Sequence, residues 1–365
     1  MTIGFIARGL TKGGVTRYIE NFLMTFDAFF SKENSLVLFT DKEDFKTAYK
    51  NIKVVYLKKS NKIFWDYIKI LPYLFKIKLD AVIYPKNIIP FTHLFFRFKK
   101  INIILDLAYF NREIKAYRFW DTLYMRVFMK LSCRLASKTV AISEYTKQDI
   151  IDRLGINPEK IKVVYLAAED YFKKQADHDL IQRTLSRLDV DKPFLFYCGS
   201  LSPRKNILRM LMAFNQIKNR IPHNIYLTNN LLWEIEDIKK YIKDNLSGRA
   251  FLIRRVSDEE LICLYSAADL YLYLSLYEGF GLPILEAQAC GCPVLTSNVT
   301  SCPEIIGEGG VSVNPYNIGE IASAMEKSLK DDKLRHNIIN NGHENIKRFS
   351  WRKCVRETLM ASEIL

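Results

Sequence analysis

The sequence has 365 residues, with 54 Lys and Arg against 40 Asp and Glu, a formal net charge of +14, and 49% hydrophobic residues. This length suits two ordinary domains, and the hydrophobic content excludes a disordered chain. The charge is uneven, because the first 150 residues hold 26 basic and 13 acidic side chains and 28 of the 47 aromatic residues, whereas the remainder is almost neutral. A nucleic-acid-binding protein that is basic throughout is therefore disfavoured.

Targeting and membrane-spanning signals are not expected in this sequence. Residues 1–9 read as a short strand running into a glycine loop, without the basic and long apolar regions of a signal peptide. The most apolar stretch, residues 88–98, is interrupted by proline, histidine and arginine well short of the roughly 20 residues that span a bilayer. Of the seven cysteines only Cys290 and Cys292 are close, and no histidine lies beside them to complete a metal site. We expect reduced cysteines in a cytosolic protein.

In chain order, short β-rich runs alternate with helical patterns, which is typical of parallel sheets flanked by helices. The first series of predicted strands comprises residues 2–7, 36–40, 53–57, 81–84, 102–106, 139–143 and 162–165. The second series comprises residues 194–198, 224–227, 251–253, 269–274, 293–296 and 311–313. The charged segment 167–192 between the two series predicts the interdomain crossing and one helix. The expected fold class is α/β with two Rossmann-like, doubly wound domains facing a central cleft, where ligands bind outside the carboxyl ends of the strands.

The first candidate loop, residues 8–14, follows the first strand and contains Gly13 and Gly14 at the start of a helix. Glycines let a ligand approach the backbone amides at the positive end of a helix, so this loop can face an anion. The spacing differs from G-x-G-x-x-G, and no acidic residue ends the second strand, which disfavours a nicotinamide enzyme. A turn without any ligand is the alternative interpretation.

The second candidate loop, residues 199–206, follows the strand at 194–198 and precedes an amphipathic helix. It has the length of a Walker A loop, but Arg204 replaces the second glycine and Asn206 the magnesium-binding hydroxyl, so it is not a P-loop. The cations Arg204 and Lys205 lie beside a helix N-terminus, which is unfavourable unless an anion is present. The loop therefore favours a phosphate ligand over a solvated pair of charges.

The most specific segment is 275–294, where a predicted strand ends in a loop with two glycines and continues into a helix. Pro283 suits the first turn of that helix, and Gly291 suits its C-terminal end. Glu278 on the loop and Glu286 in the helix can face one cleft, where carboxylates accept hydrogen bonds from hydroxyl groups. Together with the backbone amides of residues 280–282, they predict a polyhydroxylated, anionic ligand.

These motifs resemble the family 4 retaining glycosyltransferases of the GT-B fold, and among them bacterial mannosyltransferases of surface-polysaccharide synthesis. The resemblance covers essentially the whole chain and rests on residues 275–287, 290–294, 297–304 and 349–351, and upstream on 203–206, 257–261, 142–145 and the glycine loop at 13–14. It implies an N-terminal acceptor-binding domain at 1–170 and a C-terminal nucleotide-sugar-binding domain at 171–348. It also implies that a C-terminal helix at 349–365 crosses back to the first domain.

The resemblance also implies site residues, with catalytic positions at Glu278, Lys205 and Asp106. Lys205 and Arg204 would contact the donor diphosphate, Glu286 the ribose, and Glu278 the transferred sugar. The other donor-binding positions that it implies are Gly13, Gly14, Gly199, Ser200, Val256, Phe280, Gly281, Leu282, Pro283 and Thr300. The sequence departs from the family twice: Leu105 precedes Asp106 where a histidine is common, and Ser200 stands where an arginine is often found. His93 is the one histidine on a loop near the expected cleft, and a core or surface position is the more ordinary interpretation.

The activity implied is transfer of a hexose, with mannose favoured, from a nucleoside diphosphate sugar to a glycan acceptor in bacterial O-antigen, capsule or exopolysaccharide synthesis. The acceptor is expected to be linked to a polyprenyl diphosphate, and no metal or other cofactor is expected to take part in the chemistry. A catalytically inactive GT-B scaffold that binds nucleotide sugar or glycan is the rival function, motivated by Leu105 and Ser200. A nucleic-acid partner is not expected.

Two segments, 63–78 and 110–138, mix aromatic and basic residues at helical spacing. Such segments suit anionic lipid head groups, because an apolar face flanked by Lys and Arg binds at the membrane interface. They predict that the basic N-terminal domain docks on an anionic membrane surface, with the protein peripheral on the inner face of the cytoplasmic membrane. The alternative is that each helix packs on the sheet and exposes its lysines to water.

Overall fold

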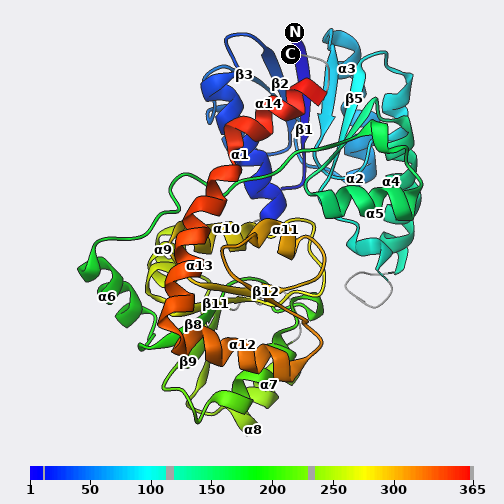
Figure 1. Cartoon of the computed structure of the whole chain (residues 1–365). Coiled ribbons are helices and arrows are strands. Elements are labelled where there is room, and N and C mark those ends of the chain that lie inside the picture. Colours follow the sequence, from blue (N-terminus) through cyan, green and yellow to red (C-terminus); the bar gives the residue numbers. More distant parts are fainter. Residues whose placement is uncertain (11–12, 112–118, 229–234, 362–365) are drawn as a thin grey trace. The chain divides into compact units, whose positions relative to one another are not determined.

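The computed structural model describes residues 1–10, 13–111, 119–228 and 235–361. These residues form two compact units, one made of residues up to Leu166 together with those from Ser350 onward, the other of Ala167–Phe349. Each unit has a parallel sheet with helices packed around it (Figure 1). Within the described part of the chain, no helix combines the length and the apolar character needed to cross a bilayer.

The sheet of the first unit has seven strands in the order β3-β2-β1-β4-β5-β6-β7, and every recorded pairing is parallel. Its strands are β1 (Thr2–Ala7), β2 (Ser35–Thr40), β3 (Ile52–Tyr56), β4 (Ala81–Tyr84), β5 (Lys99–Ile104), β6 (Lys138–Ala141) and β7 (Ile161–Val163). Its longer helices are α1 (Gly14–Phe29), α4 (Phe119–Leu135), α5 (Glu144–Leu154) and α14 (Trp351–Ala361). Short helical turns are η1 (Asp44–Lys46), α2 (Lys62–Phe64), η2 (Trp65–Lys69), α3 (Leu71–Lys76), η3 (Phe91–Phe95), η4 (Ala108–Phe110) and η5 (Pro158–Lys160).

The sheet of the second unit has six parallel strands in the order β10-β9-β8-β11-β12-β13. Its strands are β8 (Phe194–Tyr197), β9 (Asn224–Thr228), β10 (Ala250–Ile253), β11 (Leu270–Tyr273), β12 (Val294–Ser297) and β13 (Val311–Val313). Its helices are α6 (His178–Arg187), η6 (Pro203–Lys205), α7 (Ile207–Ile217), α8 (Glu236–Asn245), α9 (Asp258–Ala267), α10 (Leu282–Ala289), α11 (Cys302–Ile306), α12 (Ile318–Lys330), α13 (Asp332–Asn345) and η7 (Ile346–Arg348).

Each predicted strand corresponds to an observed one, and the largest error is at β5. The predicted strand 102–106 is wrong at both ends, because the observed strand runs from Lys99 to Ile104. Two lysines do not prevent strand formation there, since the Nζ atom of Lys100 donates hydrogen bonds to the carbonyl oxygens of Phe96 and Phe98 at 2.7 and 3.2 Å. Asp106 therefore lies beyond the strand end rather than on it.

Helix α1 shows how the apolar spacing of the sequence becomes a packed face. Its side chains at Tyr18, Ile19 and Phe22, together with Leu23 and Phe26, are buried as the period of a helix predicts. Helix α14 packs against α1 in the first unit (Figure 1), where the rings of Tyr18 and Trp351 lie 6.0 Å apart. The end of the chain is therefore part of the core that surrounds β1.

In each sheet, the direction in which successive strands are connected reverses once. In the first unit, the strands on either side of the β1–β4 pair connect in opposite directions, and in the second unit the same reversal occurs between β8 and β11. At such a reversal, the loops that follow two neighbouring strands turn to opposite faces and leave a crevice at the carboxyl ends. These two places are where each sheet is built to hold a ligand.

Candidate functional site

The loop that follows β8 begins at Gly199 and is shaped by a close approach to Tyr197. A Cβ atom at Gly199 would lie 2.8 Å from the Tyr197 hydroxyl oxygen, and the backbone φ of 153° also favours glycine. The Tyr197 hydroxyl donates a hydrogen bond of 2.7 Å to the carbonyl oxygen of Ser200. The hydroxyl groups of Ser200 and Ser202 lie 3.2 Å apart. The loop is thus fixed by a buried tyrosine of its own strand.

The two cations of this loop are held in place at both ends of η6. Asn206 has a left-handed φ of 61°, which ends η6 and starts α7, and its side-chain amide donates to the carbonyl oxygen of Pro315 at 2.7 Å. The carbonyl oxygen of Arg204 accepts a hydrogen bond of 2.8 Å from the backbone amide of Leu276, which follows β11. This bond ties the loop of β8 to the loop of β11, so that Lys205 and Glu278 meet.

Glu278 is the centre of the candidate site, because its carboxylate is shared by two cations. Lys205 Nζ pairs with Oε1 of Glu278, and Arg204 Nη1 pairs with Oε2 at 3.1 Å. Lys205 Nζ also donates to the hydroxyl oxygen of Tyr273 at 3.0 Å, and Arg204 Nη1 donates to the carbonyl oxygen of Tyr277 at 3.2 Å. Glu278 is only 6% exposed and Lys205 only 7%. The network is therefore a buried triad with net positive charge.

Burial by itself raises the pKa of the Glu278 carboxyl group, but the positive charges of Arg204 and Lys205 and the hydrogen bond from Lys205 outweigh it and lower this pKa to about 2. The carboxylate stays ionised at neutral pH. Two buried cations that share a single carboxylate can bind a further anion, because a phosphate offers several acceptor oxygens to Arg204 and Lys205. The site is suited to a diphosphate that competes with Glu278 for the two cations.

Residues after β12 hold the backbone of Glu278. The Glu278 amide donates to Oγ1 of Thr300 at 3.2 Å, and the Ser301 hydroxyl donates to the carbonyl oxygens of Glu278 and Phe280 at 3.1 and 2.7 Å. Thr300 has a φ of 59°, a left-handed conformation that a β-branched residue rarely adopts. The strained Thr300 thus contacts the loop that carries the Glu278 carboxylate.

Helix α10 begins immediately after this loop. Gly281 caps it with a φ of 112°, and Leu282 and Pro283 form its first turn. Glu286 lies in the second turn, is only 2% exposed, and accepts a hydrogen bond of 3.3 Å from the hydroxyl group of Tyr265. Val256, half-buried, precedes the Ser257 cap of α9.

The predicted site residues do not all fall in one unit. The second unit holds Gly199, Ser200, Arg204, Lys205, Val256, Glu278, Phe280, Gly281, Leu282, Pro283, Glu286 and Thr300, of which direct hydrogen bonds join Arg204, Lys205, Glu278 and Thr300. The first unit holds Gly13, Gly14 and Asp106. Gly13 caps α1, and Asp106 Oδ1 accepts a hydrogen bond of 3.1 Å from the amide of Ala108. The catalytic and binding roles of all these residues stay predictions.

Sequence reasoning missed one member of this network, Tyr273. Tyr273 is the last residue of β11, and that strand position next to a ligand loop was the signal that would have found it. His93 is fully buried, with Nδ1 3.0 Å from the Tyr84 hydroxyl and Nε2 3.0 Å from the carbonyl oxygen of Asp66, so it is a core residue. Burial lowers the pKa of His93 to about 4.

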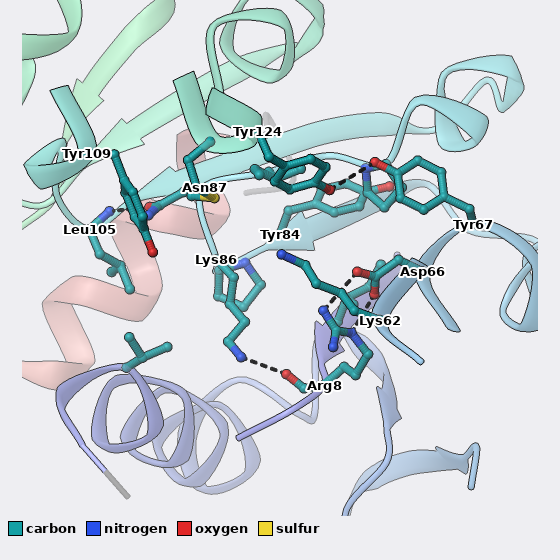
Figure 2. A pocket seen from close by; sticks show the side chains of 16 residues that line it. Arg8, Lys62, Asp66, Tyr67, Tyr84, Lys86, Asn87, Leu105, Tyr109 and Tyr124 are labelled. Atoms are coloured by element: carbon teal, nitrogen blue, oxygen red, sulfur yellow. Dashed lines mark hydrogen bonds and ion pairs between the residues drawn. The ribbon is translucent and has the colours of Figure 1, made fainter. Parts of the chain in front are cut away.

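A pocket lies in the first unit, and none of the residues paired with Glu278 lines it. It measures about 250 Å³ and sits beyond β1, β4 and β5, lined by Arg8, Lys86 and Leu105, the residues that follow these strands, and by Lys62 and Asp66 (Figure 2). Leu105 therefore lines a cavity at the position where the resembling family commonly has histidine. In the described residues, no group of three His, Cys, Asp or Glu side chains is arranged to hold a metal ion.

A known protein family matches the segment that carries these site residues. The sequence pattern of the family described as glycosyl transferases group 1 matches residues 181–345, which include Arg204, Lys205, Glu278 and Glu286. The matched residues make up most of the second unit. The predicted resemblance to glycosyltransferases is thereby confirmed, and it is strongest where the ion-paired loops lie.

Relatives of the glycosyl transferase domain extend the likeness. The chain is 30% identical over 245 residues to O-antigen chain mannosyltransferase B of Escherichia coli, which is 66% of this chain and 64% of that protein, so it spans just under two thirds of this relative. The structure resembles a glycosyltransferase of Rickettsia africae ESF-5 (TM-score 0.78, 18% identity, 100% of this chain and 98% of the other). It also resembles Anabaena HepE in complex with UDP and glucose (TM-score 0.79, 17% identity, 100% and 99%). The predicted GT-B fold class, with two Rossmann-like domains, is confirmed.

Replacing Glu278 by glutamine tests the buried triad. We expect Glu278→Gln to lower the free energy of unfolding at pH 7 by about 3 kcal/mol, because it leaves two buried cations without their carboxylate. Inorganic phosphate should restore part of this loss by taking the place of the carboxylate. Urea unfolding with and without phosphate measures both effects, and Glu236→Gln, which removes an exposed partner of Lys239, is the matched control.

The pH dependence of the same variant has a defined sign. Because the pKa of Glu278 is lowered from its ordinary value of 4.5, its stabilisation is complete above about pH 4.5 and is lost as the pH falls toward 2. The difference in unfolding free energy between wild type and Glu278→Gln should stay constant from pH 7 to 5 and narrow below that. A difference that is small at pH 7, or that grows on acidification, would contradict the assignment.

Proposed function

We propose that the protein is a retaining glycosyltransferase that transfers a hexose, with mannose favoured, from a nucleoside diphosphate sugar to a glycan acceptor of bacterial surface polysaccharide. The observation that carries this proposal is the pairing of Arg204 and Lys205 with Glu278 at the β8–β11 reversal, inside the matched family domain. The similar Escherichia coli protein is named as an O-antigen mannosyltransferase, which supports mannose and this acceptor class. The similar Anabaena structure holds UDP and glucose, which supports a nucleotide-sugar donor.

The proposed mechanism begins with an exchange of partners at the triad. The donor diphosphate takes Arg204 and Lys205 away from Glu278, and the freed carboxylate accepts hydrogen bonds from hydroxyl groups of the transferred sugar. The same two cations then stabilise the negative charge that develops on the leaving diphosphate. The acceptor hydroxyl attacks on the face from which the diphosphate departs, and a leaving phosphate oxygen takes its proton. We propose that this charge stabilisation needs no metal ion, that Glu286 holds the ribose, and that Asp106 and the Gly13–Gly14 backbone act from the first unit.

A second part of the proposal concerns the membrane. Helix α4 buries Met125, Met129 and Cys133 on one face, yet a second apolar stripe is exposed at Trp120, Leu123, Val127, Leu131 and Leu135. A helix that is apolar on two faces requires an apolar environment for the second one. The stripe follows the spacing of a helix, and Arg134 lies exposed beside it. The predicted solvated lysine face therefore does not describe α4.

Neighbouring segments extend this exposed apolar surface. The hydroxyl groups of Tyr67 in η2 and Tyr124 in α4 lie 3.2 Å apart, and the rings of Tyr67 and Phe91 are 5.0 Å apart, so η2, η3 and α4 are adjacent. Their exposed apolar side chains, with those of α2 and α3, are Ile63, Phe64, Ile68, Phe75, Phe91 and Phe95, and exposed cations among them include Lys62, Lys76, Lys78 and Arg97. We define these residues and the α4 stripe as the basic–aromatic surface. The charge of this surface, apart from Lys62, whose ammonium group lines the pocket of the first unit, matches an anionic bilayer. We propose this bilayer as its occupant and as the place where a polyprenyl-diphosphate-linked acceptor is met.

Replacing Lys205 tests the transferase proposal. Lys205→Ala should reduce the rate of sugar transfer about 100-fold or more, because a cation is lost from the developing charge on the leaving group. The measurement is transfer across a panel of nucleoside diphosphate sugars, with thermal shifts by the matching nucleoside diphosphates as a binding readout. Lys243→Ala, an exposed lysine of α8, is the control. Undiminished transfer by Lys205→Ala would refute the site, and nucleotide binding by the wild type without transfer from any donor would favour the scaffold function.

Vesicle binding tests the basic–aromatic surface. The double variant Leu123→Glu, Val127→Glu should bind vesicles of phosphatidylglycerol and phosphatidylethanolamine at least about tenfold more weakly than the wild type, since it places carboxylates on the apolar stripe. Leu180→Glu in α6 makes the same kind of change at an exposed leucine of the second unit and should bind normally. Flotation at low and high salt is the measurement. Binding that ignores both lipid charge and salt would contradict the proposal.

A further inference from the structure

The pocket of the first unit holds an excess of positive charge that its own residues do not neutralise. The charged side chains that line it are Arg8, Lys62, Asp66 and Lys86. Arg8 forms two hydrogen bonds with the Asp66 carboxylate, from Nε at 2.6 Å and Nη2 at 2.8 Å, so this pair is neutral. Two ammonium groups remain: that of Lys86 points to the backbone carbonyl oxygen of Arg8, and the Lys62 side chain lies beside the Arg8–Asp66 pair (Figure 2).

Neither ammonium group has a carboxylate within ion-pair distance among the described residues. Lys86 Nζ donates instead to the carbonyl oxygens of Arg8 and Gly9, at 2.7 and 3.0 Å. Lys62 Nζ lies 4.7 Å from the ring centroid of Tyr124 and makes no recorded hydrogen bond. Two further carboxylates act on these ammonium groups from outside the pocket lining: Asp121 on Lys62, and Asp41 on Lys86. Asp41 accepts a hydrogen bond of 2.8 Å from the amide of Gly9.

This arrangement is electrostatically costly in the ligand-free protein. Burial and the neighbouring charge of Arg8 lower the pKa of Lys86 to about 8, and the same two causes lower the pKa of Lys62. Burial also raises the pKa of Asp66, against the effect of Arg8. An anion in the pocket relieves the shifts of the two lysines, whereas it adds to the shift of Asp66, which Arg8 opposes. The backbone carbonyl oxygens hold Lys86 in place before any ligand arrives.

The walls of the pocket define the rest of the ligand. Tyr67, Tyr109 and Tyr124 contribute rings and hydroxyl groups, and Leu105 and Met125 contribute apolar surface. A volume of about 250 Å³ is near the lower end of the roughly 300–1,000 Å³ of small-molecule sites. A neutral sugar would leave both ammonium groups without a negative charge to pair with, and a bare inorganic ion would leave the tyrosine rings uncovered.

We propose that this pocket binds an oxyanion of the acceptor, a phosphoryl or carboxyl group joined to a sugar or isoprenoid body, with Lys62 and Lys86 as its ligands and the Arg8–Asp66 pair as its support. The identification of the ligand as the acceptor rests on the proposed transferase function. The oxyanion site itself rests on the geometry of the first unit. It lies at the β1–β4 reversal, as the Lys205–Glu278 pair lies at the β8–β11 reversal. Selectivity for a charged acceptor over a neutral one follows from the two ammonium groups, neither of which has a carboxylate partner among the described residues.

The test uses the full chain with labelled methionine methyl groups, observed by NMR during titration with inorganic pyrophosphate and, separately, with acetate. Met125 lines the pocket, and Met325 in the core of the second unit serves as an internal reference. At least one of the two anions should shift the Met125 signal in a saturable way. Tighter pyrophosphate binding assigns the oxyanion to a carrier diphosphate, and tighter acetate binding assigns it to an acidic sugar.

Variants decide whether the lysines are the ligands. Lys62→Gln and Lys86→Gln should each lower, by about tenfold or more, the affinity for the anion that shifts the Met125 signal. Lys53→Gln, on the exposed side of β3, should leave this affinity unchanged. Lys62→Gln decides alone if Lys86→Gln fails to fold, because Lys62 holds no backbone group. A Met125 signal unmoved by both anions, or equal affinity in Lys62→Gln and Lys53→Gln, overturns the proposal. Lys205→Ala should keep the Met125 response, so a failed transferase proposal and a failed pocket give different results.

Discussion

The carboxylate of Glu278, buried between Arg204 and Lys205, is the interaction on which the second unit depends at its ligand-binding edge. It joins the loop after β8 to the loop after β11, and the backbone bond from Leu276 to Arg204 runs beside it. A buried ion pair costs desolvation, which is repaid only where geometry and further hydrogen bonds are good. Here those bonds come from Tyr273 and from the backbone carbonyl oxygen of Tyr277. Because desolvation makes these ion pairs costly, the two cations can exchange the carboxylate for a ligand that offers more acceptor oxygens.

The two units each hold a lysine at the strand-order reversal of their sheet, but with different partner residues. Each parallel sheet reverses its connections once, and each reversal carries a lysine that follows a strand and is held before any ligand is bound: Lys205 by Glu278 and Tyr273, and Lys86 by two carbonyl oxygens. The charged side chains lie in the loops, and the strands that precede these loops fix their positions. We propose that a protein of this design binds two anionic partners, one in each unit, although the excess positive charge lies in the first half of the sequence.

Much of this organisation could be predicted from the sequence because it depends on local patterns. Strand and helix periods located the sheets, and Glu278, Lys205 and Arg204 were recognisable because they sit in loops between a strand and a helix. The predicted strand at 102–106 left out Lys99 and Lys100, which β5 accommodates because neighbouring carbonyl oxygens hold the ammonium group of Lys100.

Contacts between distant segments could not be predicted in this way. The Arg8–Asp66 pair joins residues 58 positions apart, and Lys86 reaches the carbonyl oxygen of Arg8 from 78 positions away. The apolar face of segment 110–138 was predicted only as one of two alternatives, since periodicity alone does not tell which of two apolar faces is buried. Both features depend on how the chain packs, and both bear on the partners of the first unit.

The most direct test of the central claim is the crystal structure of the full chain with the nucleoside diphosphate that stabilises it most against heat. The account predicts that phosphate oxygens lie within hydrogen-bond distance of Lys205 Nζ and the Arg204 guanidinium, and that Glu278 no longer pairs with both cations. A nucleotide bound with both Glu278 ion pairs intact, and with its phosphates away from Arg204 and Lys205, would contradict the account.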